Sequence, residues 1–174
     1  MEELRLAITP YYLYVKAVHV LAAMVWAFST AVAWAFYLRP AFKAALRDPD
    51  DTVAIERRNF LMERFDRGAA VEHVAFPVLV VTALLLLWMG RVDLTQWNAI
   101  TAKLWIGVLV IIPMECVDYY LSHFGGNKAS IRRSGDAERY ERFMAYHWRF
   151  FQVTEPLVVV IVPLMVFLAV ARPF

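Results

Sequence analysis

Long apolar runs alternate with short charged segments along this chain, a pattern typical of a protein that crosses a bilayer several times. Four runs are long enough for a transmembrane helix: residues 10–38, 69–90, 99–122 and 147–171. Backbone groups inside a bilayer must be paired within their own segment, so each run is expected to be helical. The sequence therefore predicts an all-α membrane protein, a four-transmembrane-helix bundle that forms a single domain over residues 1–174.

Two charged segments also carry a helical pattern. Residues 48–51, Asp-Pro-Asp-Asp, are expected to break an extension of the first helix, and residues 52–67 then place apolar side chains at intervals among charged ones. This spacing predicts an amphipathic helix that continues into the second apolar run as one long helix. Residues 136–144 similarly lead into the fourth run, and the first membrane span is expected to end at about Leu38, just before Pro40.

Basic residues are distributed unevenly between the two ends of the predicted bundle. The end that holds the connections 39–67 and 124–149, called side B, carries 13 of the 18 Lys and Arg residues, and side A, with both termini, carries five. The positive-inside rule then places side B and its helical extension in the cytoplasm, and both termini outside an inner or plasma membrane. A net charge of only +2 gives no reason to expect nucleic acid as a partner.

Ionisable side chains inside the apolar runs are costly unless something compensates them, so each is a candidate functional residue. His19 is the strongest candidate, because Met24 and Trp26 follow it as parts of an apolar wall suited to a porphyrin. One interpretation makes His19 an axial ligand of a haem iron. The other is a buried histidine that forms a hydrogen bond with a neighbouring helix.

A second set of ionisable residues lies towards side B. One interpretation is a metal site, a second is another haem between histidines, and a third is a proton path to the cytoplasm. Alternatively, the histidines lie at the level of the lipid headgroups. The pattern leaves these interpretations open for Glu72, His73, Glu115, His123 and His147.

Several short motifs follow one another along the chain: Lys16-Ala-Val-His19 with Trp26 seven residues on, Phe36–Pro40, Met62-Glu-Arg64 with Pro77, Trp97 with Lys103-Leu104, Arg149–Pro156 and the final Arg172-Pro-Phe174. Together these motifs resemble those of the HemJ-type protoporphyrinogen oxidases, small four-helix membrane proteins of haem synthesis. The motifs follow the family's order along nearly the whole chain. Two departures are Thr154 in place of an asparagine and the inverted order of Arg39-Pro40.

The resemblance implies a function and a set of site residues. It implies haem b held by His19, and oxidation of protoporphyrinogen IX to protoporphyrin IX, with electrons passed to a quinone or the respiratory chain. Lys103 would then orient a carboxylate or a haem propionate, Glu155 would accept protons, and Arg64 is a further catalytic candidate from a shared motif.

Two other functions remain open from the residues. One is a haem-binding or structural accessory subunit of a larger membrane electron-transfer complex. The other is a metal-handling membrane protein. The expected partners are the lipid bilayer, a porphyrin or quinone, and further copies of the chain or other subunits of such a complex.

Overall fold

The computed structural model describes residues 2–171, without the side chain of Ser29, and this part of the chain forms helices joined by short turns. The first rod comprises α1 (Glu2–Ile8), the 3-10 turn η1 (Thr9–Tyr11), α2 (Tyr12–Ala33), the π-helical turn η2 (Trp34–Leu38) and α3 (Arg39–Arg47). The second is α4 (Thr52–Met89). The third comprises α5 (Ala99–Ile106), the π-helical turn η3 (Gly107–Ile111) and α6 (Ile112–His123). The short α7 (Lys128–Arg133) follows, and the long α8 (Ala137–Val170) is the fourth rod.

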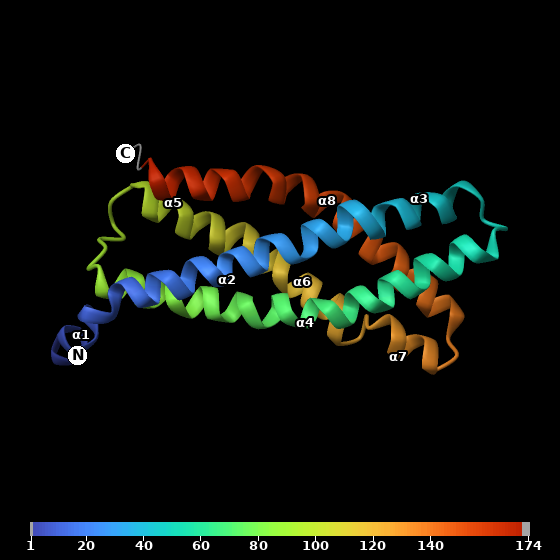
Figure 1. Cartoon of the computed structure of the whole chain (residues 1–174), viewed down its shortest axis with the longest axis horizontal. Helices are drawn as coiled ribbons and strands as arrows, with labels where there is room; N and C mark the ends of the chain where they lie inside the picture. Colours follow the sequence, from blue (N-terminus) through green and yellow to red (C-terminus); the bar gives the residue numbers. More distant parts are fainter. Residues whose placement is uncertain (1, 172–174) are drawn as a thin grey trace.

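The four rods run up and down as one elongated bundle (Figure 1). The helix α1 and the C-terminal end of α8 lie at side A together with the turn from α4 to α5, and side B holds the turns that follow α3 and α7 (Figure 1). Each rod is long and apolar enough to cross a membrane. The prediction of four long apolar helices is therefore confirmed, and the chain has the form of a multi-pass membrane protein.

The outer surface of the bundle is largely apolar. Between 6% and 22% of the most apolar window of each rod is buried within the bundle, so most of its side chains face outward. Large apolar side chains such as Leu13, Phe36, Val71 and Val159 expose more than 60% of their surface. A surface of this extent is unfavourable in water and is compatible with lipid.

Beyond the predicted end of the span at Leu38, the first helix has the extension that the sequence predicted, and it ends at Arg47, before residues 48–51. The chain passes Pro40 at η2, where the helix widens into a π-helical turn directly before Arg39-Pro40. Proline removes a backbone donor and crowds the preceding turn, and a widened turn accommodates both effects. The same relationship recurs in the third rod, where η3 ends two residues before Pro113.

The predicted amphipathic helix is present and continuous with the second span, because α4 runs unbroken from Thr52 to Met89. Its first turn is capped by Asp51, whose side chain accepts from the backbone N–H of Val53 at 2.9 Å and of Ala54 at 3.0 Å. α3 packs against this half of α4, so the extension at side B is a pair of helices. Likewise, residues 137–146 form the beginning of α8.

Aromatic side chains hold the rods together at side B. Trp148 stacks on Phe42, with ring centroids 4.7 Å apart and planes 8° from parallel. Trp34, at the start of the π-helical turn, lies 4.9 Å from Phe151 on α8, and Phe65 on α4 lies 5.2 Å from the same ring. This core joins η2, α3, α4 and α8 and fixes the position of the polar groups beside it.

Candidate functional site

His19 is anchored to α4 through one ring nitrogen. Its Nδ1 lies 3.2 Å from the carbonyl oxygen of Leu79 and 3.0 Å from the hydroxyl of Thr82. A carbonyl only accepts, so Nδ1 carries the proton and donates it, and Nε2 keeps its lone pair. Within residues 2–171 no hydrogen bond to Nε2 is found, and the ring is half-buried. This is the arrangement that metal-ligating histidines adopt, in which the second nitrogen is fixed by a carbonyl.

Lys103 lies on α5 towards the same side A. The two residues to which the family resemblance assigns haem and carboxylate binding, His19 and Lys103, thus lie towards the same side of the bundle. Lys103 is half-buried, so its flexible side chain lies at the edge of the bundle rather than in its core.

Trp26 and Met24, the two residues predicted to flank a porphyrin, lie on different faces of α2. Trp26 lies two turns after His19 on the same face of α2, exposes 8% of its surface and donates from its indole N–H to Glu115 at 2.7 Å. Met24 follows His19 by five residues, which rotates it by about 140° around the helix axis. It exposes 51% of its surface on the outer side of the bundle and does not share the face of His19.

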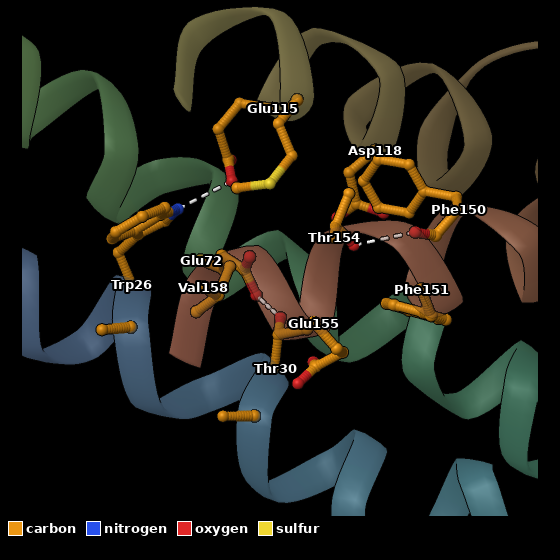
Figure 2. Close-up of a pocket in the computed structure, with 13 residues that line it drawn as sticks. Trp26, Thr30, Glu72, Glu115, Asp118, Phe150, Phe151, Thr154, Glu155 and Val158 are labelled. Carbon is orange, nitrogen blue, oxygen red and sulfur yellow. Dashed lines mark hydrogen bonds between the residues drawn. The ribbon is translucent and has the colours of Figure 1, made fainter. Parts of the chain in front are cut away.

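A cavity with both apolar and ionisable side chains in its lining lies in the middle of the bundle, between α2, α4, α6 and α8 (Figure 2). Its polar lining includes three predicted residues, Glu72, Glu115 and Glu155. The hydroxyl of Thr30 donates to Glu72, and Glu115 accepts from Trp26 through one oxygen (Figure 2). The other oxygen of Glu115 is buried and makes no hydrogen bond with the residues described.

The predicted side-B histidines meet around one carboxylate, Asp118 on α6. His147 donates from Nε2 to Asp118 at 3.0 Å. His73 approaches the other oxygen of Asp118 at 3.2 Å, at ion-pair distance but without the alignment of a hydrogen bond. Nδ1 of His73 also lies 2.7 Å from Nε2 of His123. These contacts form a continuous line of ionisable groups from the cavity to side B.

A buried ion pair that the sequence did not reveal supports this line from the other side. Lys128 is fully buried; its ammonium lies 3.2 Å from Asp66, donates to the carbonyl of Leu121 at 2.9 Å and contacts Nδ1 of His147. Both members of the pair lie outside the apolar runs. Burial lowers the pKa of the Lys128 ammonium and raises the pKa of Asp66, because water no longer solvates either charge, while their attraction opposes both shifts.

In the sequence, Lys128 stands out only as one of the basic residues of side B. A local signal for its burial is the sequence Gly125-Gly126-Asn127 before it. A Cβ at Gly126 would lie 2.7 Å from Cα of Leu121 and 2.8 Å from its carbonyl oxygen, so the turn needs glycine to approach α6 so closely. Asn127 then caps α7 and places Lys128 at its first position.

A second metal site among the side-B residues gains no geometric support. Among the described residues, no group of three or more His, Cys, Asp or Glu side chains has a geometry that could hold a metal ion. The reason is visible in the contacts of His73 and His147. Their ring nitrogens are directed at Asp118, His123 and Lys128, not at one common point.

Arg64 lies far from His19 and Lys103. Thr82, whose hydroxyl contacts His19, follows Arg64 by 18 residues on α4. At 1.5 Å per residue this separation corresponds to about 27 Å along the helix. The guanidinium of Arg64 covers the ring of Phe60, and Arg64 lines a groove with Tyr37, Glu72 and apolar residues of η2 and α4. The volume of this groove, about 270 Å³, lies below the ~300–1,000 Å³ typical of small-molecule sites.

The predicted catalytic residues thus occupy three levels of the bundle: Lys103 at side A, Glu155 at the central cavity and Arg64 at side B.

In comparisons with known proteins, no family model matches the chain, and no curated protein or solved structure shows significant similarity. The resemblance to the HemJ-type oxidases therefore depends on the quoted sequence stretches alone. Its last motif, Arg172–Phe174, lies outside the described residues.

Proposed function

We propose that this chain binds haem b in the membrane and oxidises protoporphyrinogen IX, or a closely similar porphyrinogen, with electrons passed to a quinone or the respiratory chain. One observation carries the proposal: the Nδ1–H of His19 is fixed by the carbonyl of Leu79, which leaves Nε2 as a lone-pair donor in an apolar setting. An imidazole held in this way suits a haem iron. Bound haem would supply one-electron redox chemistry.

The residues around His19 have separate roles in this proposal. Thr82 and Leu79 orient the ring of His19, so that its Nε2 is presented in a fixed direction. Lys103 binds a carboxylate, either of the porphyrinogen or of a haem propionate, because an ammonium on a long stem can reach one without rigid geometry. Glu155, the predicted proton acceptor, is half-buried at the central cavity, and an apolar core separates it from His19, so it has no direct role in the reaction at side A. Arg64 takes no part at this distance.

The orientation in the membrane is part of the same proposal. Thirteen of the 18 basic residues lie at side B, so this side faces the cytoplasm of an inner or plasma membrane and both termini lie outside it. His19 and Lys103 are then near the outer surface. The substrate, which has carboxylates on an apolar ring, would enter from the lipid with its carboxylates at this surface.

An assay with purified protein tests the proposal. The wild-type protein, expressed in haem-replete cells, is purified in detergent and supplied with protoporphyrinogen IX and a soluble quinone, and porphyrin fluorescence is followed. We expect oxidation by the wild type and its loss in His19→Ala. Lys103→Met should retain haem but raise KM for the porphyrinogen. Met24→Leu, on the outer surface, is the matched control and should behave as the wild type.

A haem-containing wild-type protein that does not oxidise the porphyrinogen with any quinone would contradict the enzymatic part of the proposal. It would favour the role of a haem-binding accessory subunit in a larger electron-transfer complex. Equal oxidation rates in the wild type and in His19→Ala would contradict the role of His19.

A further inference from the structure

We propose that the chain contains a one-sided proton route, which connects the central cavity with the water at side B through Asp118, His73 and His123. The inference does not rest on the proposed haem chemistry, because it concerns proton exchange by the chain's own side chains. It assigns a function to buried ionisable residues that a haem at His19 leaves without a role. Four observations carry it.

The inner end of the route is Glu115. It exposes 5% of its surface, and one of its carboxylate oxygens is buried without a hydrogen-bond partner among the described residues. This carboxylate lines the same cavity as Glu72 and Glu155, and Figure 2 shows the three grouped around it. The proposal requires a water molecule in this cavity, which has a volume of about 30 Å³, to relay a proton between the carboxylates and Asp118.

The outer end of the route is His123, the last residue of α6. Asp118 also lines the cavity, and its Oδ2 lies 3.2 Å from Nε2 of His73. Nδ1 of His73 is 2.7 Å from Nε2 of His123, which is only partly buried and lies beside the turn at side B. Each step therefore joins groups that bind and release protons, at a distance short enough for transfer.

The other oxygen of Asp118 leads to a closed branch. It accepts from His147, which is held by Lys128 and, through it, by Asp66. His147 and Lys128 expose none of their surface, and Asp66 exposes 1%. Because this branch has no outlet to water in the described structure, we infer that it positions Asp118 and that protons leave through His73.

The route ends at the cavity and does not continue to side A. Between the cavity and the level of His19 and Lys103, the described spans contain no Asp, Glu, Lys, Arg or His side chain. Thr82, which contacts His19, is ten residues from Glu72 along α4, or about 15 Å. The intervening core contains Ala75 and Ile111 and is apolar. Protons at Glu115 therefore exchange with side B alone.

The test uses a hydrophobic carbodiimide, which modifies carboxyl groups when they carry a proton. The full chain is reconstituted into liposomes in one orientation, the pH is changed on one side, and modification of Glu115 is measured by mass spectrometry. Glu115→Gln identifies the modified position. Asp93→Asn, which alters an exposed carboxylate at side A, is the control. Haem is not needed for this measurement, so its result is independent of the proposed oxidase activity.

We expect modification of Glu115 to increase when side B is acidified and to be unaffected by acidification of side A alone. His73→Phe should slow this response by at least about tenfold, because it removes the link between Asp118 and His123. His123→Gln, at a partly exposed position, should also slow it and serves if His73→Phe does not fold. Modification controlled by side A, absent modification, or an equal response in His123→Gln would overturn the proposal.

Discussion

The ammonium of Lys128 lies 3.2 Å from the carboxylate of Asp66, although neither side chain exposes any surface. The two residues are 62 positions apart and belong to different helices, α7 and α4. Their contact closes the side-B end of the bundle and supports His147, which in turn holds Asp118. Stability and the geometry of the proposed proton route thus depend on the same pair.

Removal of one partner of this pair should strongly destabilise the protein. Lys128→Met leaves Asp66 as a buried charge without its cation, which we expect to cost about 3–5 kcal/mol of unfolding free energy. Thermal unfolding in detergent measures the loss. Lys43→Met, at an exposed position of α3, is the matched control and should change little. The double variant Asp66→Asn with Lys128→Met should recover part of the loss. Thermal unfolding of Lys128→Met at the same temperature as the wild type would contradict the buried pair.

Gly126 and Gly68 should respond in opposite ways to alanine. Gly126→Ala places a Cβ 2.7 Å from the backbone of Leu121, so we expect a loss of about 1–3 kcal/mol. A Cβ added at Gly68, inside α4, would meet no heavy atom within 4 Å, so Gly68→Ala should stabilise the helix by roughly 0.5–1 kcal/mol. The unfolding temperatures of both variants check this. Equal shifts would show that the turn is not closely packed against α6.

The hydroxyl of Thr82 should influence haem binding through His19. Thr82→Val removes one of the two groups that orient the ring, and we expect haem affinity to fall about 10-fold or more. Titration of the haem-free protein with haem, followed by absorbance, gives the affinity. Thr154→Val is the matched control, since the hydroxyl of Thr154 donates to the carbonyl of Phe150 in its own helix at 2.9 Å. Equal affinity in wild type and Thr82→Val would argue against His19 as the ligand.

The proposed orientation can be checked with reporters fused to the C-terminus. With side B in the cytoplasm, an alkaline phosphatase fusion, which is active only outside the cytoplasm, should be active. A green fluorescent protein fusion at the same position should be non-fluorescent in bacterial cells. The same two fusions placed in the turn at residues 48–51 should give the opposite pattern. Reversed results would place both termini in the cytoplasm.

The rods of this bundle are predictable from sequence because each apolar run has to be helical in a bilayer. The backbone of the first rod near Pro40 was not predictable in the same way. A proline at position 40 normally marks a helix end, and only the backbone of residues 34–38 shows that a π-helical turn absorbs it. The amphipathic pattern after residue 52, in contrast, was sufficient to predict that α4 continues into the membrane.

The sequence predicted some residues of the candidate site correctly and misplaced or missed others. Depth along the helices placed His19 and Lys103 at the same end, and helical periodicity places Trp26 on the face of His19. Met24 was grouped with them by proximity in sequence, but it lies on another face of the helix. Asp66 and Lys128 were missed, because a buried ion pair between distant segments depends on how a turn folds back on its neighbours.

The most direct test of the central claim is the reduced-minus-oxidised absorbance spectrum of the purified protein from haem-replete cells, recorded for the wild type and for His19→Ala. The account predicts b-type haem bands in the wild type and their loss in the variant, with both proteins monodisperse on gel filtration. A folded wild-type protein without these bands would contradict it, as would an identical spectrum in His19→Ala.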